Sequence, residues 1–222
     1  MLEIGLTGGI GSGKSTVAEM LVSRGMQLVD ADAVVRELQQ PGTPVLEAMA
    51  DRFGNHIIDA TGALDRAAVA AIVFSDPDEL EALNAIVHPA VNEEMTRRRK
   101  AFVGTDETVI LDIPLLIESN YEGLGGIIVV DCPVDVAVNR LMSHRNMPEE
   151  DARNRINAQV SRKERKERAD FVVDNSSDLV ALIEKVDELE AWIKTLARPD
   201  IDAPIATIKG RYQPARAHDE EE

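Results

Sequence analysis

The sequence predicts an α/β fold built around a five-stranded parallel sheet. Five short apolar runs with strand character alternate with longer helical stretches, at residues 2–6, 27–29, 108–113, 127–131 and 171–174. This alternation is typical of parallel sheets, because each parallel connection needs a crossover that is usually a helix. A glycine-rich segment follows the first run directly. Ligands bind at the carboxyl ends of such strands, so we expect the functional site at that edge of the sheet.

The glycine-rich segment carries the complete phosphate-loop pattern. Gly8 and Gly13 stand at the required spacing before Lys14, and a helical run follows at residues 16–23. Glycines let backbone N–H groups face phosphate oxygens, and the helix N-terminus adds a favourable dipole. We therefore predict the three-layer fold of P-loop nucleoside triphosphatases. The expected ATP-binding residues are Gly8, Gly9, Gly11, Ser12, Gly13, Lys14, Ser15 and Thr16.

Specific roles follow for the charged and hydroxyl side chains of this loop. Lys14 is expected to reach the β and γ phosphates, and Thr16 to support the α-phosphate. Ser15 is expected to place its hydroxyl on Mg²⁺. Asp112 ends the run at 108–113 and resembles the Walker B acid near Mg²⁺, so it is the second expected metal ligand. A hydrogen-bonded turn residue explains Asp112 equally well.

Two carboxylates, Asp30 and Asp32, follow the second predicted strand. Both should emerge at the edge that carries the phosphate loop. A carboxylate there can orient an acceptor hydroxyl and accept its proton during attack on the γ-phosphate. We favour Asp32 as this base, which predicts a kinase acting on a small-molecule hydroxyl. In the structural alternative, Asp30 only ends the strand and Asp32 caps a helix at 33–39.

The segment between the second and third strands is too long for a simple crossover. It contains helical periodicity at residues 45–53, 66–73 and 79–102. We expect an inserted, helical acceptor-binding subdomain at about 41–104. Pro89 lies inside the last helical stretch, so a break or restart is expected near His88.

Residues 139–168 reverse the charge of the chain. They contain nine Lys or Arg against five Asp or Glu, whereas the whole chain has a net charge of -16. We interpret this segment as a helical lid that faces phosphate. Arg140 and Arg145 are the expected contacts to the transferring phosphoryl group. The alternating charges at 162–168 instead indicate surface pairing along an exposed helix.

The remaining sequence separates a folded core from a tail. The core is expected at 1–40, 105–138 and 169–196, with Ser177 as the N-cap of a last helix. The prolines and charges of 197–222 indicate a disordered acidic tail. The single cysteine, Cys132, has no expected role beyond a small apolar residue.

Composition excludes several function classes. The chain has 222 residues, 44% of them hydrophobic, which is enough for a sizeable core. The net charge of -16 disfavours a nucleic-acid partner. No apolar run approaches the roughly 20 residues that span a bilayer, and the opening segment is not a signal peptide. The expected location is cytoplasmic, with no membrane partner.

Several stretches together resemble the dephospho-coenzyme A kinase family. The matching stretches are residues 4–16, 30–32, 62–66, 83–89, 112–118 and 140–141, with Arg145, 169–170 and 174–175. The resemblance spans residues 1 to about 196. It implies transfer of the ATP γ-phosphate to the ribose 3'-hydroxyl of dephospho-CoA with Mg²⁺, the last step of coenzyme A synthesis.

The same resemblance implies residue roles. Asp32 matches the catalytic aspartate, Arg140 a lid arginine that contacts ATP, and Asn175 a residue of the ATP site. Arg66, Asn84 and His88 lie in the part that resembles the CoA domain and are expected to bind the acceptor. Helix capping remains an alternative for His88.

Two other functions remain as alternatives. A second small-molecule kinase of this fold would act on a nucleoside monophosphate or a similar acceptor. A nucleotide switch would change partners on hydrolysis without phosphorylating a metabolite. The guanine-reading Asn-Lys-x-Asp motif of GTPase switches is absent from the sequence.

Overall fold

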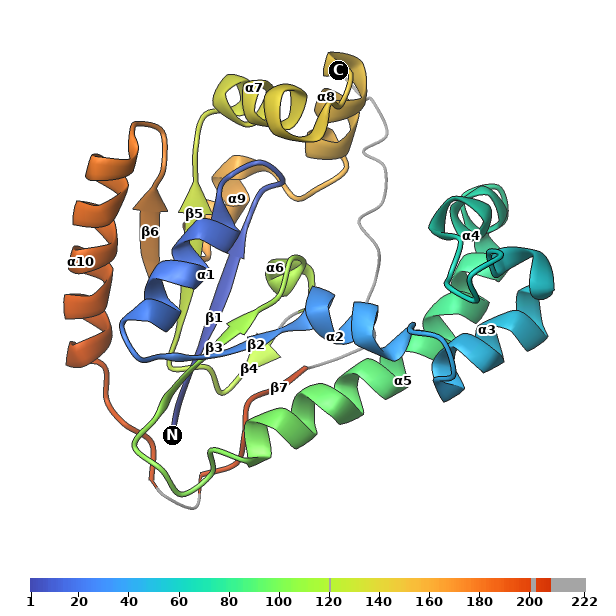
Figure 1. Ribbon diagram of the computed structural model, residues 1–222. Helices are drawn as coiled ribbons and strands as arrows, with labels where there is room; N and C mark the ends of the chain where they lie inside the picture. Colours follow the sequence, from blue (N-terminus) through green and yellow to red (C-terminus); the bar gives the residue numbers. More distant parts are fainter. Residues whose placement is uncertain (120, 201–202, 209–222) are drawn as a thin grey trace. The chain divides into compact units, whose positions relative to one another are not determined.

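The computed structural model, which describes residues 1–119, 121–200 and 203–208, contains a five-stranded sheet (Figure 1). Its strands are β1 (Leu2–Gly8), β2 (Gln27–Asp30), β3 (Thr108–Asp112), β5 (Gly126–Asp131) and β6 (Phe171–Asp174). The strand order is β2-β3-β1-β5-β6. β1 pairs in parallel with β3 and with β5, and β5 pairs in parallel with β6. The predicted α/β fold with a five-stranded parallel sheet is confirmed.

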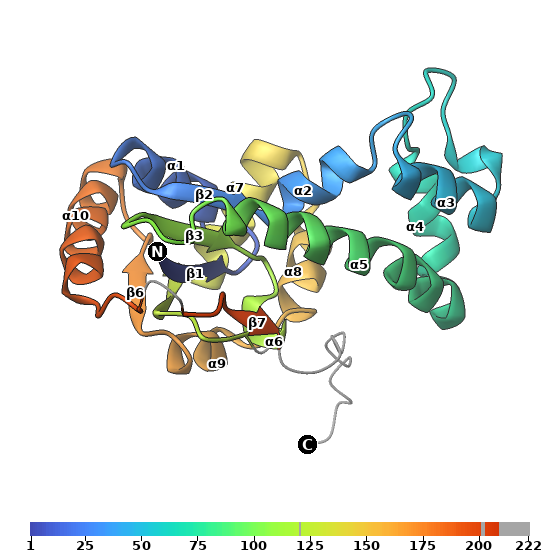
Figure 2. The ribbon, with the colours of Figure 1, turned by 90° about the horizontal axis from the view of Figure 1, so that it is seen from below.

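Helices cover both faces of this sheet. On one face lie α1 (Lys14–Ser23) and α10 (Leu179–Thr195), which contribute to one core cluster with the central strands. On the other face lie α6 (Leu116–Ser119), against β1, and α9 (Arg162–Glu167), against β5 (Figure 2). Every residue of β1 is buried, which explains why that strand reads as a continuous apolar run. The three-layer arrangement follows from this burial.

The last long helix begins one residue later than the sequence suggested. Asp178, and not Ser177, is the N-cap of α10, and its carboxylate accepts a hydrogen bond from Ala181 N at 3.0 Å. Serine and aspartate are both favoured at the N-cap, so the local sequence could not distinguish Ser177 from Asp178 as the cap. The prediction of Ser177 as the cap is wrong.

Two further helices lie beyond the carboxyl end of β5 (Figure 1). They are α7 (Val134–Arg145) and α8 (Glu149–Asn157), and they pack on each other around Val138, Leu141 and Ala152. Ile10 of the phosphate loop packs against this cluster. The loop is therefore joined to the predicted lid segment by apolar contacts.

The chain divides into two compact units. One contains Met1–Val29 with Phe102–Glu222, and the other is Asp30–Ala101. The second unit consists of α2 (Ala31–Leu38), α3 (Pro44–Phe53), η1 (Asn55–Ile57), α4 (Arg66–Val73) and α5 (Pro77–Lys100). It has its own apolar cluster, centred on Met49 and Ile57. Within the described parts of both units, no helix is long and apolar enough to cross a membrane.

Pro89 does not interrupt α5, which runs unbroken from Pro77 to Lys100 (Figure 1). The predicted break near His88 is therefore wrong. Proline inside a helix costs about 3 kcal/mol, because it removes one hydrogen bond and crowds the preceding turn. α5 also packs against α2, α3 and α4 and buries Val87 and Met95. Burying such side chains contributes about 1.5–3 kcal/mol each, which offsets the proline.

Residues after α10 are partly ordered, which corrects the expectation of an unstructured tail from residue 197. β7 (Thr207–Ile208) pairs antiparallel with β4 (Tyr121–Glu122). Ala206 N donates a hydrogen bond of 2.7 Å to the carboxylate of Glu3, which is buried. Such short pairings leave no periodicity in the sequence. The rest of that prediction, at 201–202 and 209–222, lies outside the described residues.

Candidate phosphate-binding site

The phosphate loop joins β1 to α1, as its pattern predicted. Gly11 and Gly13 have φ angles of 79° and 88°, which are in the left-handed region that favours glycine. The turn is closed by hydrogen bonds from Ser12 N to Gly9 O at 3.0 Å and from Thr16 N to Gly13 O at 3.1 Å. Ser15 and Thr16 are exposed in the first turn of α1. The loop therefore presents an accessible helix N-terminus to an anion.

Asn175 and Arg140 hold the loop from outside. Asn175 follows β6, is buried, and donates from Nδ2 to Ser12 O at 2.7 Å. Arg140 of α7 donates from Nη1 to the same oxygen at 3.4 Å and from Nη2 to Asn175 Oδ1 at 3.4 Å. A Cβ atom at Gly13 would lie 2.2 Å from Asn175 Nδ2, so this approach requires glycine. Two expected ATP-site residues thus meet at the loop.

Lys14 forms an ion pair with Asp112 at the carboxyl end of β3. Pairing of β1 with β3 aligns Leu6 with Asp112, which brings the carboxylate beside the loop. The Asp112 side chain is 4% exposed and that of Lys14 is 16% exposed. The acidic and the basic residue of the predicted site are therefore adjacent, and Asp112 neutralises Lys14.

A second carboxylate at the same edge, Asp131, was not singled out from the sequence. Its side chain is 7% exposed, and it accepts two hydrogen bonds of 2.7 Å from Nε and Nη2 of Arg162. Lys166 Nζ lies 3.9 Å from the same carboxylate. These hydrogen bonds raise the pKa of the Arg162 guanidinium. Asp131 ends the apolar run at 127–131, and an acid at the end of a predicted strand was the sequence signal that could have identified it.

The end of the predicted lid also touches the first half of the phosphate loop. Gln159 Oε1 accepts a hydrogen bond of 2.9 Å from Ile10 N. A Cβ atom at Gly9 would lie 2.8 Å from Arg165 Nη2. These residues border a cavity of about 390 Å³ that is also lined by Ser12, Asp131 and Arg162. Sequence reasoning missed Gln159 and Arg165, because no local pattern marks them.

The expectation for residues 162–168 is confirmed only for the outer side of α9. Lys163 lies 3.7 Å from Glu167, and Arg168 lies 3.4 Å from Glu164, each as an exposed i,i+4 pair. Surface pairing is wrong for Arg162, which faces the buried Asp131. Helical spacing alone does not say which face meets the sheet, so the sequence could not separate the two faces.

Two other sequence candidates lie away from the loop contacts. Arg145 is the last residue of α7 and is exposed, and within the described residues it makes no hydrogen bond to the loop. Cys132 is buried next to the loop, where desolvation raises the pKa of its thiol. Its Sγ is 3.9 Å from Gly11 O. The thiol is therefore protonated at neutral pH, consistent with the absence of an expected role.

In the second unit, Asp30 and Asp32 have different environments. Asp30 is the N-cap of α2 and accepts a hydrogen bond of 3.0 Å from Ala33 N. Asp32 lies in the first turn of that helix, and its side chain is exposed. Within the described residues, no hydrogen bond or ion pair involves the Asp32 carboxylate. The structural alternative for Asp32 as a cap is therefore wrong, because Asp30 performs that role.

The three expected acceptor residues lie on α4 and α5. Arg66 is the first residue of α4 and is exposed, while Asp65 caps that helix. Asn84 and His88 are four residues apart on α5 and therefore share one face. Both are half-buried, and desolvation lowers the pKa of the His88 imidazole.

Groups suited to Mg²⁺ are sparse but of the right kind. No cluster of three or more metal-ligating side chains occurs among the described residues. A nucleotide-bound Mg²⁺ keeps several waters and takes most ligands from phosphate, so one hydroxyl and one carboxylate are sufficient. The exposed Ser15 hydroxyl and the carboxylate of Asp112 meet that requirement at the loop.

Comparison with known proteins assigns the family. The dephospho-CoA kinase family model matches residues 2–181. The curated dephospho-CoA kinase of Thermobifida fusca is 46% identical over 190 residues, covering 85% of this chain and 94% of the relative. That of Streptomyces avermitilis is 44% identical over 192 residues, covering 86% and 93%. A crystal structure of a Thermus thermophilus protein is 35% identical, covers 86% of this chain and 97% of that one, and has a TM-score of 0.74. The chain therefore belongs to the dephospho-CoA kinase family.

Proposed function

We propose that this protein transfers the γ-phosphate of ATP to the ribose 3'-hydroxyl of dephospho-CoA, giving coenzyme A and ADP. The observation that carries this proposal is the family match over residues 2–181, which includes the phosphate loop and the whole helical unit at 30–101. Relatives named for this activity cover most of the chain at 44–46% identity. With ATP as the donor, the proposed location is the cytoplasm.

The nucleotide is held by the first unit in this proposal. The triphosphate occupies the loop of Gly8, Gly9, Gly11, Ser12 and Gly13, with its negative charge at the N-terminus of α1. Lys14 turns from Asp112 toward the β and γ phosphates. Arg140, Arg145 and Asn175 contribute to the ATP site. The hydrogen bonds of Arg140 and Asn175 to Ser12 O support that assignment, because they place both side chains against the loop.

Ser15 and Asp112 are the proposed protein ligands of Mg²⁺. When bound, the ion neutralises phosphate charge that develops during transfer. Asp112 is positioned for this role because its carboxylate lies beside the loop, in contact with Lys14. Ser15 meets the same requirement through its exposed position in the first turn of α1. The ion also needs the oxygen ligands that ATP and water supply.

Asp32 is the proposed general base. Its carboxylate accepts the proton of the 3'-hydroxyl while the hydroxyl oxygen forms a bond to the γ-phosphorus. The bond between that phosphorus and the bridging oxygen breaks, and ADP leaves with the electron pair. Thr16 supports the α-phosphate side. Arg66, Asn84 and His88 are proposed to bind the acceptor, and the exposure of Asp32 and Arg66 leaves both side chains accessible to a ligand.

The decisive experiment is an acceptor comparison with the purified protein, ATP and MgCl₂. We expect rapid ADP release with dephospho-CoA, and mass spectrometry should identify coenzyme A. A 3'-deoxy analogue of dephospho-CoA is the matched control, because it retains the acceptor contacts but lacks the reacting hydroxyl. It should inhibit without being phosphorylated. Rapid ADP release with a nucleoside monophosphate but not with dephospho-CoA would contradict the proposed acceptor.

The cation requirement needs its own measurement. Chelation by EDTA should abolish turnover, and added Mg²⁺ should restore it. Asp112→Asn should raise the Mg²⁺ concentration needed for half-maximal rate, because one anionic ligand is lost. An unchanged Mg²⁺ dependence in this variant would remove Asp112 from the metal site.

A further inference from the structure

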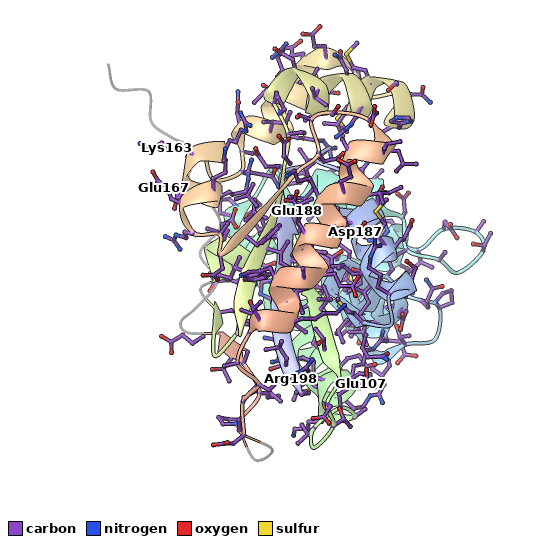
Figure 3. All side chains as sticks on the ribbon, turned by 90° about the vertical axis from the view of Figure 1, so that its left-hand side faces the viewer. Glu107, Lys163, Glu167, Asp187, Glu188 and Arg198 are labelled. Carbon is purple, nitrogen blue, oxygen red and sulfur yellow. The ribbon has the colours of Figure 1, made fainter. Side chains whose placement is uncertain are left out.

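The basic residues of α9 are divided between two faces of the helix. Arg162, Arg165 and Lys166 are spaced i, i+3 and i+4, so they share one face, which meets β5 and the phosphate loop. Lys163 and Glu167 lie on the outer side, with side chains 85% and 62% exposed (Figure 3). Arg162 and Arg165 are therefore held in place by contacts within the fold, whereas Lys163 is solvated and Lys166 is partly exposed.

Ion pairs neutralise only some of the cations on this face of α9. The Asp131 carboxylate accepts two hydrogen bonds from Arg162, and Lys166 Nζ lies 3.9 Å from the same carboxylate. Arg165 donates from Nη1 to the carbonyl oxygen of Val160, and in the described part of the chain no carboxylate lies within ion-pair distance of it. Burial lowers the pKa of the half-buried Arg165 guanidinium. The charges of Glu118 and Asp131 act on this guanidinium from beyond ion-pair distance and oppose that shift. A desolvated cation without a direct ion-pair partner is stabilised by a bound anion.

The position of Arg165 indicates which anion it meets. Its Nη2 is directed at Gly9, in the first half of the loop, and Gln159 covers the neighbouring Ile10 N–H. The second half of the loop leads into α1, whose N-terminus receives the inner phosphates. A cation above Gly9 is therefore on the side of the terminal phosphate. The cavity of about 390 Å³ between the loop and α9 provides space for that group.

We propose that Arg165 contacts the terminal phosphoryl group of ATP and stabilises its charge during transfer. The inference rests on the proposed kinase function and adds to it a phosphate-contacting residue in the same site. The ion pair between Arg162 and Asp131 holds α9 against β5, so that the Arg165 guanidinium points at the loop. Arg165 remains protonated while the phosphorus exchanges its bond to ADP for a bond to the acceptor oxygen. Planar guanidinium donors match phosphate oxygens in pairs, which a lysine cannot reproduce.

Gln159 acts together with Arg165 in this proposal. Its side-chain oxygen accepts a hydrogen bond of 2.9 Å from Ile10 N. A phosphate oxygen takes the same N–H when ATP binds, and the neutral amide leaves without a charge penalty. A carboxylate at this position would compete with the phosphate for both Ile10 N and Arg165. Gln159→Glu therefore tests the same geometry without removing the arginine.

The test compares nucleotide binding and turnover in three variants of the full chain with MgCl₂ present. Arg165→Met should leave ADP affinity within about twofold and weaken a non-hydrolysable ATP analogue at least tenfold. It should also lower kcat with dephospho-CoA by about 10³-fold, the scale of an arginine that stabilises phosphoryl transfer. For Arg165→Lys, kcat and the affinity for the ATP analogue should lie between the values of Arg165→Met and those of the unsubstituted protein. Gln159→Glu should weaken the ATP analogue but not ADP.

Lys163→Met is the matched control, since it removes a cation from the outer side of the same helix. It should keep the kcat and both affinities of the unsubstituted protein. The proposal is overturned if Arg165→Met keeps normal kcat, or if ADP and the ATP analogue lose affinity equally while the melting temperature falls. If the unsubstituted protein makes no coenzyme A, the acceptor assignment fails, whereas the comparison of ADP with the ATP analogue still decides the role of Arg165.

Discussion

The two compact units hold their candidate residues in opposite ways. In the unit that carries the phosphate loop, Lys14 is paired with Asp112 and Arg162 with Asp131, and both acids are buried. In the helical unit at 30–101, Asp32 and Arg66 are exposed, and within the described residues neither has a hydrogen-bonding or ionic partner. The first set is held by ion pairs within the protein, whereas the second set exposes its polar groups to solvent.

This difference affects how substitutions should behave. Removing one member of a buried pair leaves an uncompensated charge, so stability and activity fall together. Removing an exposed polar group with no protein partner affects function but leaves the folded state nearly unchanged. The ratio between loss of activity and loss of stability therefore distinguishes the two units. Three substitutions, taken from the largest expected effect to the smallest, measure that ratio.

Lys14→Met should have the largest effect on both quantities. Turnover should fall by about 10³-fold, because a charge that stabilises the transferring phosphoryl group is lost. The free energy of unfolding should fall by about 3–5 kcal/mol, because the buried Asp112 carboxylate loses its ion pair with Lys14. Steady-state kinetics and urea denaturation provide the two measurements.

A double substitution separates the two consequences of Lys14→Met. Adding Asp112→Asn removes the carboxylate charge that Lys14 balances and should restore most of the stability without restoring turnover. If Lys14→Met alone proves as stable as the unsubstituted protein, the Lys14–Asp112 pair does not act as a buried ion pair.

Asp32→Asn should lower turnover by about 10²-fold or more, the scale of a general base, with unfolding free energy unchanged within about 0.5 kcal/mol. ATP affinity should remain, since the substitution removes no nucleotide contact in the proposed mechanism. Asp30→Asn is the matched comparison, because asparagine caps a helix as well as aspartate does. It should keep both turnover and stability. If Asp30→Asn lost most of its turnover while Asp32→Asn kept normal turnover, Asp30 and not Asp32 would be the general base.

Glu94→Gln should have the smallest effect of the three substitutions, and this effect should be confined to the free energy of unfolding. Hydrogen bonds from Arg97 and Arg98 lower the pKa of the Glu94 carboxyl from 4.5 to about 2. Such surface pairs contribute about 0.2–1 kcal/mol, which Glu94→Gln should remove at pH 7. Because the folded-state pKa is depressed, the contribution is present above pH 4.5 and is lost as pH falls toward 2.

Urea denaturation at pH 7, 4 and 3 measures this pH dependence. The stability difference between Glu94→Gln and the unsubstituted protein should shrink as pH falls. Glu93→Gln, an exposed neighbour on α5, serves as the control and should differ little from the unsubstituted protein at each pH. A constant difference across this range would show that the two arginines do not stabilise the Glu94 carboxylate.

Local patterns predicted the fold and the nucleotide loop well. The strand at 171–174 and the helix at 66–73 have the same bounds in the structure as in the sequence analysis. The patterns failed where one residue type serves two purposes or where packing outweighs propensity. Ser177 and Asp178 are equivalent as local cap signals, and the proline at 89 reads as a break although burial of α5 sustains the helix.

The sequence by itself determined the phosphate loop, because glycine spacing, Lys14 and Ser15 act within one short segment whose backbone geometry they dictate. It also determined the alternation of strands and helices, and with it the edge where the site lies. Only the tertiary structure decided which cations face that site. Arg165 and Lys163 look alike along the chain, and the packing of α9 on β5 directs one at the loop and the other at solvent. Contacts between residues some 150 positions apart, such as that between Gly9 and Arg165, leave no local pattern to read.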